Sequence, residues 1–407
     1  MFEHTIKHNS DDYSSGYTYK QEFNIRFSYD VHFTREVFKP ENRLLASVMA
    51  APETPASGIP PAASRVLVCI DSGVAACHPD LPEQVQAYFR RYAADIQPAA
   101  PPHIVPGGEQ AKNDRQNVHR IMTALAACRL DRQSYVIAVG GGSVLDMVGF
   151  TAAVIHRGLR LIRIPSTVLA QNDAGVGVKN GINALGAKNF IGTFAPPYAV
   201  INDATLLTTL STEDWRGGIA EAIKVALIKD RDFFEYICLQ AEALKARNLH
   251  VMEELVRRCA VLHLEHIRTQ GDPFEFGSSR PLDFGHWSAH KLEVMSRFRI
   301  GHGQAVAIGI ALDSCYARMA GFITAADSRR ILDCLLACGL PVWDPLLEKR
   351  DEEGNYEILK GLEEFREHLG GKLCITLPSP PGHKVEVHEM DIRRITDGIM
   401  SLKNGVK

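Results

Sequence analysis

The alternation of two kinds of segment between residues 65 and 207 constrains the fold more than any other feature of the sequence. Short runs rich in β-branched residues, VLVCI, YVIAV, LRLIRI and YAVIN, are separated by longer runs with helical spacing, LPEQVQAYFRRYAAD, NVHRIMTALAACRL and VLDMVGFTAAVIHR. Apolar strands that alternate with helices are typical of a parallel sheet covered by helices. Beyond Leu210 the strand signal fades and long periodic segments dominate, which predicts a mostly α-helical second half.

The length of the chain favours two domains, because a single hydrophobic core stops growing near about 250 to 300 residues and this chain has 407. We place an α/β nucleotide-binding domain at residues 1–207 and a helical domain at residues 208–407. Residues up to about 16 are expected to be disordered. QEFNIRFSYDVHF (21–33) is expected to form one or two strands of a hairpin, and APETPASGIPPAAS (51–64) is expected to be a loop.

Charge and hydropathy argue against two classes of partner. The net charge of −3, from 45 basic and 48 acidic residues, gives no field that would attract nucleic acid or an anionic membrane. No apolar run approaches the roughly 20 residues that span a bilayer, and the first residues are too polar for a secretory signal, so we expect a cytoplasmic protein. The nine cysteines are expected to be reduced thiols. Cys334 and Cys338, one helical turn apart, could ligate a metal, but core packing is the expectation.

Three consecutive glycines follow one predicted strand and precede a predicted helix. In YVIAVGGGSVLDMVGF these are Gly140, Gly141 and Gly142, with Ser143 near the helix cap and Asp146 as the last residue of the GGGS-x-x-D pattern. Glycine lets the backbone approach a phosphate, and a helix N-terminus offers free N–H groups, so this turn is a candidate phosphate site. A tight turn that needs positive φ is the alternative. The pattern is not the G-x-G-x-x-G of an ordinary Rossmann protein.

Other candidate cofactor residues lie upstream of these glycines. Asp71 ends the first apolar strand, where open α/β sheets bind ligands, although an aspartate before Gly73 is also a common turn residue. IVPGGEQAKND offers Glu109 as a carboxylate for ribose hydroxyls and Lys112 as an ammonium for a phosphate.

Five motifs in a fixed order resemble one known family. PGGEQAK, GGGSVLD, RIPSTVLAQNDAGVGVKNGIN, GAKNFIG and GGIAEAIK resemble the 3-dehydroquinate synthase superfamily, the sugar phosphate cyclases, over roughly residues 65 to 380. The resemblance implies NAD in the α/β domain, a metal in the helical domain and a homodimer. It adds Ser166, Thr167 and Lys188 to the expected cofactor-binding residues.

The segment RPLDFGHWSAHKLEVMSRFRIGHGQA (280–305) carries three histidines. A catalytic zinc takes three protein ligands from histidine and carboxylate and leaves one position open. The resemblance implies that Glu221, His286 and His302 are these ligands, for zinc or cobalt. His290 lies on the same helix face as His286 and is another candidate ligand, but the resemblance places it beside the substrate phosphate.

The resemblance also implies which residues hold the substrate. Lys224 would contact a substrate hydroxyl and Asp173 would hold hydroxyls. The expected phosphate-binding residues are Lys179, Lys188, Asn189, Arg280 and, reaching in from a neighbouring subunit, Arg157. In this family, bound NAD oxidises a ring hydroxyl, phosphate is eliminated, the hydride returns and the opened sugar closes to a carbocycle, with the metal as Lewis acid and no net redox change.

The substrate prediction depends on where this chain departs from 3-dehydroquinate synthase itself. His263 stands where a carboxylate-binding lysine is expected, and Asp283 replaces an asparagine. Arg280 is one residue nearer to Asp283 than the family arginine is to its asparagine, EEFREHLGGKL replaces an Asp-Lys-Lys, and Gln304 replaces a glutamate. A buried carboxylate needs a cationic partner, so these changes favour a neutral end of the sugar.

The predicted activity is therefore that of a sedoheptulose 7-phosphate cyclase, which DFGH and FREHLGG resemble. Its product would be 2-epi-5-epi-valiolone or 2-epi-valiolone. Three alternatives stay open: 3-dehydroquinate synthase, a metal-dependent polyol dehydrogenase that shares the GGGS-x-x-D turn, and a non-catalytic NAD-binding protein.

Overall fold

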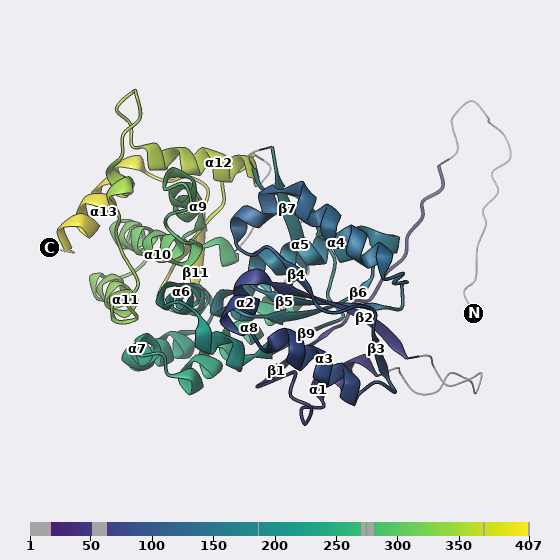
Figure 1. The fold of residues 1–407 in the computed structure, drawn as a ribbon. Helices are drawn as coiled ribbons and strands as arrows, with labels where there is room; N and C mark the ends of the chain where they lie inside the picture. The colour runs from purple at the N-terminus through teal and green to yellow at the C-terminus, as the bar shows by residue number, and fades with distance from the viewer. Residues whose placement is uncertain are drawn as a thin grey trace, which may run out of the picture.

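The computed structural model describes residues 18–50, 63–185, 187–269, 274, 281–368 and 371–405. Its first half is built on a seven-stranded parallel sheet with the order β1-β9-β6-β5-β2-β3, in which β4 also pairs with β2 (Figure 1). The bounds are β1 (Asp30–Thr34), β2 (Ser64–Asp71), β3 (Ile96–Pro98), β4 (His103–Val105), β5 (Tyr135–Gly140), β6 (Arg160–Pro165) and β9 (Ala199–Asp203). The predicted fold class, a helix-covered parallel sheet followed by a helical half, is confirmed.

Helices cover both faces of this sheet because its central strands are apolar on both sides. In β5, Ile137 and Val139 pack into one buried cluster while Val136 and Ala138 pack into another. The first cluster is closed by α1 (Leu44–Met49) and α3 (Leu81–Arg91), and the second by α4 (Arg115–Ala127) and α5 (Gly142–Val154). Alternate side chains of one strand therefore serve two layers of helices.

The predicted N-terminal hairpin is wrong. Only Asp30–Thr34 forms a strand, and it lies parallel to β9, with Asp30 opposite Ala199 and Thr34 opposite Asp203. Alternation of apolar and polar residues predicts an extended chain but not its partner, and here the partner is far along the sequence. The predicted disorder up to residue 16 lies outside the described residues, as does most of the predicted loop at 51–64.

Helices dominate after residue 210, and their bounds follow from local signals. Ser211 caps α6 by accepting a hydrogen bond from Asp214 N at 3.0 Å, and Thr324 and Asp327 form a capping box on α11. The helices are α6 (Thr212–Lys229), α7 (Arg231–Lys245), α8 (Leu249–Thr269), α9 (His286–Met295), α10 (His302–Met319), α11 (Ala325–Ala337), α12 (Lys360–His368) and α13 (Ile392–Gly405). Two small antiparallel pairs complete the fold, β7 (Lys179–Ala184) with β8 (Ala187–Phe194) and β10 (Ile375–Pro378) with β11 (Lys384–Val387). The division of the chain at residue 207 remains a prediction.

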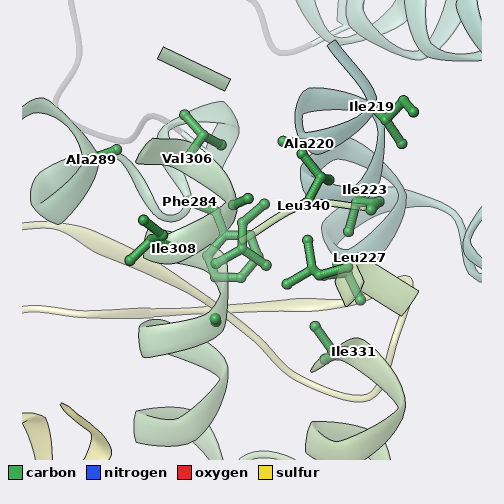
Figure 2. Close-up of a cluster of buried hydrophobic side chains, with 14 of the residues drawn as sticks. Ile219, Ala220, Ile223, Leu227, Phe284, Ala289, Val306, Ile308, Ile331 and Leu340 are labelled. Atoms are coloured by element: carbon green, nitrogen blue, oxygen red, sulfur yellow. The ribbon is translucent and has the colours of Figure 1, made fainter. Parts of the chain in front are cut away.

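The core of the helical half holds α6, α9, α10 and α11 together (Figure 2). Ile219, Ala220 and Ile223 of α6 belong to the same buried cluster as Phe284, Ala289, Val306, Ile308, Ile331 and Leu340. Cys334 and Cys338 are buried in this core, as predicted, and neither belongs to a possible metal-binding group of the described residues. Within the described part of the chain, no helix is both long and apolar enough to cross a membrane.

Two glycines set the distance between α6 and α10. A Cβ atom on Gly303 would lie 2.2 Å from the carbonyl oxygen of Gly217 and 2.3 Å from its Cα. α10 therefore cannot carry a larger residue at position 303 without moving, whereas a Cβ on Gly217 would lie 3.6 Å from the Cα of Gly303, an ordinary contact. The short distance between the two helices at this contact also limits the distance between neighbouring residues of α6 and α10.

Candidate active site

The carboxyl ends of β2 and β5 bring most of the predicted cofactor residues together. Asp71 caps the short helix α2 (Ser72–Cys77), accepting from Gly73 N at 2.7 Å. A Cβ on Gly140 would lie 3.0 Å from the Cβ of Asp71, so the strand ends touch. Gly141 caps α5 and lies against Thr167, and Ser166 N donates to the carbonyl of Gly140 at 2.9 Å. Gly142 and Ser143 form the first turn of α5.

Lys112 links these residues to the β7–β8 hairpin. Its ammonium lies 2.8 Å from Asp146 Oδ2 and 3.7 Å from Glu109 Oε1, and it also contacts the side-chain oxygen of Asn189. Asn183 donates to Glu109 at 3.0 Å and accepts from Asn189 N at 2.8 Å. Lys112 is only 2% exposed, and its ammonium is held by Asp146. Its predicted contact with a cofactor phosphate stays a prediction.

Glu221, His286 and His302 converge, although they lie on three different helices. Glu221 Oε1 is 3.6 Å from His286 Nε2 and 3.2 Å from His302 Nε2, and one ligand atom from each of the three residues lies within 4.8 Å of the others. Both carboxylate oxygens of Glu221 are fully buried, with Oε1 facing the two imidazoles and Oε2 against the ammonium of Lys224. A buried carboxylate flanked by two imidazoles satisfies the donor set of a catalytic zinc site.

Backbone and side-chain contacts orient the two histidines. His286 Nδ1 is 3.1 Å from the carbonyl oxygen of Phe284, and His302 Nδ1 is 3.0 Å from Glu293 Oε2. In each ring the Nε2 atom is thus left to face Glu221, as ligand histidines require. Although burial opposes it, His302 holds the pKa of Glu293 well below its usual range.

The start of α9 is fixed by a second buried carboxylate. Asp313 accepts from Gly285 N at 3.1 Å and from Trp287 Nε1 at 2.8 Å, and burial raises the pKa of Asp313 to about 7. Gly285 itself has φ of 77° and lies against the backbone of α10, so that no other residue fits there without strain. His286 is therefore held at the first position of a helix whose entry is rigid.

Asp173 and Lys224 join the two halves of the molecule beside the triad. Asp173 lies in the π-helical turn η3 (Ala170–Ala174), and Lys224 is buried on α6 with its ammonium against Glu221. Asp173 Oδ1 is 2.9 Å from Nδ1 of His263 on α8. Burial raises the pKa of Asp173, but Lys224 and His263 outweigh it and lower that pKa to about 2. Burial likewise disfavours the charged lysine, but Glu221 and Asp173 raise the pKa of Lys224 above its usual value.

The predicted phosphate-binding residues are only partly brought together. Lys188 of β8 reaches Glu293 of α9 at 3.3 Å, so the hairpin crosses to the helical half beside His302. His290 stacks within 6.0 Å of the His302 ring and forms with Glu293 and His302 a second possible metal-binding group. Lys179 begins β7 and is exposed. Asp283 ends the short turn η5 (Pro281–Asp283), and its charge contributes to the raised pKa of Lys224.

Two predicted phosphate ligands are not seen at this site. Arg157 lies in the exposed turn η2 (Ile155–Arg157), at a surface cavity of about 590 Å³ that Arg129, Arg132 and His156 also line. Its predicted reach into a neighbouring subunit stays a prediction. Arg280 lies outside the described residues.

Sequence reasoning missed Glu293 and Asn183. Glu293 follows His286 by seven residues and His290 by three, so helical spacing places all three on one face of α9, and this signal was available. Asn183 had no such signal, because its partner Glu109 belongs to a different element.

The structure thus combines two features. An α/β sheet carries a glycine turn at its carboxyl edge, as dinucleotide-binding folds do, and beside it two histidines and a glutamate form a buried cluster suited to a metal ion. Residues 102–217 match the family model described as 3-dehydroquinate synthase N-terminal, and residues 218–360 match 3-dehydroquinate synthase C-terminal. The chain belongs to the 3-dehydroquinate synthase family, as its motifs predicted, and is an enzyme of that family.

Curated relatives carry two different activities. A 2-epi-5-epi-valiolone synthase of Streptomyces glaucescens is 35% identical over 319 residues, 78% of this chain and 77% of the relative. A 3-dehydroquinate synthase of Dictyoglomus thermophilum (strain ATCC 35947 / DSM 3960 / H-6-12) is 35% identical over 287 residues, 70% of this chain and 78% of the relative.

A similar solved structure is ValA, a 2-epi-5-epi-valiolone synthase from Streptomyces hygroscopicus subsp. jinggangensis 5008 with NAD+ and Zn2+ bound. It superposes with a TM-score of 0.82 at 28% identity, over 95% of this chain and all of that one.

Proposed function

We propose that this enzyme is a sedoheptulose 7-phosphate cyclase, a carbon–oxygen lyase that eliminates phosphate and closes a seven-carbon cyclitol without net redox change. Its product would be 2-epi-5-epi-valiolone or 2-epi-valiolone. It would act in the cytoplasm as a homodimer, with NAD and a zinc or cobalt ion as cofactors.

One observation carries the choice of substrate: His263 is paired with Asp173. A sugar acid needs a cation for its carboxylate, and His263 stands where the resemblance leads us to expect a lysine for that purpose. Here its Nδ1 is 2.9 Å from Asp173, so its ring is held by an acidic partner. Asp283 adds a second negative charge close enough to affect Lys224. A substrate carboxylate would be repelled here, whereas a neutral hydroxymethyl ketone would not.

The buried triad fits a divalent ion. Both oxygens of Glu221 are buried, and the other two residues present ring nitrogens to Oε1. Glu221, His286 and His302 would hold the ion, and the sheet edge at Asp71 and Gly140 to Gly142 would hold the dinucleotide. When bound, the two cofactors would supply a Lewis acid and a hydride acceptor.

The chain's own charged residues position the sugar. Lys224 remains an ammonium because Glu221 and Asp173 stabilise its charge, so it donates to a substrate hydroxyl near the metal. Asp173 remains a carboxylate near neutral pH and accepts from hydroxyls. Lys179, Lys188, Asn189, His290 and Arg280, with Arg157 of a partner subunit, would surround the phosphate.

Phosphate release tests this proposal. With NAD and zinc or cobalt, we expect the full-length enzyme to release phosphate from sedoheptulose 7-phosphate and little from the corresponding seven-carbon sugar acid phosphate. His263→Lys should raise turnover of the sugar acid phosphate, and His263→Asn, which adds no charge, should not. The opposite preference in the unmodified enzyme would establish 3-dehydroquinate synthase activity. This is the second candidate function, because the relative in Dictyoglomus thermophilum is a 3-dehydroquinate synthase. Steady growth of NADH absorbance with a polyol would instead indicate a dehydrogenase.

A further inference from the structure

Residues 18–29, which we call the N-terminal arm, have the sequence of an amphipathic strand. Tyr19, Phe23, Ile25 and Phe27 occupy odd positions, and Lys20, Glu22, Asn24 and Arg26 occupy the even positions between them. Successive side chains of an extended chain point to opposite sides, so the apolar residues share one face, which is continuous from Phe23 to Phe27 and is separated from Tyr19 by Gln21.

This apolar face is exposed to solvent. The exposed fractions are 67% for Tyr19, 71% for Phe23, 65% for Ile25 and 57% for Phe27. Residues 18–28 form no strand and no backbone hydrogen bond with any other described residue. Figure 1 shows the arm as the purple segment that leaves the body of the molecule. Among the described residues, this extended segment therefore lacks both of the interactions that stabilise a strand, which are burial of its apolar face and pairing of its backbone.

The arm is attached firmly at its other end. Tyr29 donates from its hydroxyl to the carbonyl of Val176 at 2.8 Å, and β1 follows directly in the sheet. Phe27 contacts the ring of Phe274, with 6.0 Å between centroids, and Phe274 stacks on Phe194 at 5.4 Å. The nine residues of the arm before Phe27, if extended, reach about 30 Å beyond this anchor at about 3.3 Å per residue, which is enough to extend onto the surface of a second molecule.

The chain also has a surface that matches the arm. β8 pairs with β7 on one side only within the described residues, and its side chains are mostly exposed. Phe190 is 59% exposed, Phe194 is 43% exposed, and Leu185 in the preceding turn is 84% exposed. An exposed strand edge with apolar side chains is the usual acceptor of an added strand.

We propose that the arm of each protomer packs on the exposed β8 strand of a second copy of this chain. One chain that carries both the donor strand and the acceptor edge makes a self-complementary interface, which closes as a two-fold dimer. The anchored end of the arm is linked to Phe194 through Phe274, and Phe194 lies opposite Lys179 in the β7–β8 register. The exchange therefore places the partner next to the hairpin that carries predicted substrate ligands.

Sedimentation equilibrium of the full chain tests the role of the arm, and it needs neither substrate nor cofactor. We expect a dimer whose dissociation constant rises at least tenfold in the double variant Phe23→Ser, Ile25→Ser. Leu239→Ser is the matched control, since Leu239 is 81% exposed on α7, and it should leave the constant unchanged. The unfolding midpoint of the dissociated double variant should match that of the dissociated unmodified chain. A monomeric unmodified protein, or a dimer unaffected by the double variant, would overturn the proposal.

Cross-linking identifies the receiving surface. On a Cys77→Ser background, which removes an exposed thiol, chains with Ile25→Cys are mixed with tagged chains carrying Phe190→Cys and treated with a short bis-maleimide. We expect a cross-link between the two chains, absent when either introduced cysteine is left out. A further variant carries Ile25→Cys and Phe190→Cys in the same chain. If it cross-links only within itself, the arm folds back on its own β8, which would overturn the proposal. If no cross-link forms at all, β8 is excluded as the acceptor.

Discussion

The two halves of this enzyme build their parts of the site in opposite ways. In the α/β half the predicted cofactor residues come mainly from the ends of strands and the turns just after them, such as Asp71 at the end of β2 and Gly140 at the end of β5, and backbone geometry aligns them. In the helical half the three predicted metal ligands start from α6, α9 and α10, and side-chain packing aligns them. A local motif can therefore create the first kind of site, whereas the second kind exists only after the helices have packed.

The difference teaches where each half is sensitive. A parallel sheet places strand ends at one edge whatever the details of its surface. The triad instead depends on the close crossing of Gly217 and Gly303 and on the rigid entry to α9 at Gly285. Changes at these crossings should disturb the metal site from a distance, and changes at the strand ends should not.

The largest expected effect is from His286→Ala. Loss of one of three ligands should lower metal content to background and reduce phosphate release at least about a thousandfold, because Lewis-acid stabilisation supplies several kcal/mol to the barrier. NAD affinity should stay within about twofold. Metal analysis and a fluorescence titration with NAD make the two measurements, and the exposed His250→Ala serves as control. Full metal content in His286→Ala would refute its assignment as a ligand.

A somewhat smaller effect is expected from Gly303→Ala, which touches no ligand directly. Its methyl group would lie 2.2 Å from the Gly217 carbonyl oxygen, so α6 and α10 must separate and carry Glu221 and His302 apart. Overpacking of this kind costs about 1 to 3 kcal/mol. We expect a lower unfolding midpoint and at least about tenfold weaker metal binding. Gly405→Ala, which meets open space, should change neither quantity. Unaltered metal affinity would contradict the dependence on helix crossing.

The smallest effect is expected from Gly140→Ala. This change should weaken NAD binding and leave the metal site intact, the reverse of the two changes above. The added Cβ would lie 2.8 Å from Val144 Cβ and 3.0 Å from Asp71 Cβ, so the first turn of α5 must move slightly away from the strand ends. NAD should bind about tenfold more weakly, from about 1 to 2 kcal/mol of local strain, while zinc content remains full. Parallel titrations with NAD and zinc measure this. Loss of zinc with normal NAD binding would show that the two sites are not separable in this way.

The features that could be predicted from the sequence are those determined by residues close together in the chain. The strand runs, the glycine turn and the helices of the second half followed from spacing alone, because each is fixed by neighbours in the chain. The N-terminal hairpin was wrong because β1 pairs with β9, and no local signal records a partner so far away. The pairing of His263 with Asp173 was likewise beyond prediction, since it joins α8 to the turn η3. The resemblance to a known family, and not periodicity, is what pointed to Glu221 together with His286 and His302.

The order of the elements has a consequence for biosynthesis. All strands of the seven-stranded sheet lie between Asp30 and Asp203, and the first triad residue is Glu221. On the ribosome, N-terminal units fold first, so the sheet can close around β9 while every histidine of the triad is still untranslated. Metal acquisition is then a late event in the life of the nascent chain, completed only when α10 emerges and packs.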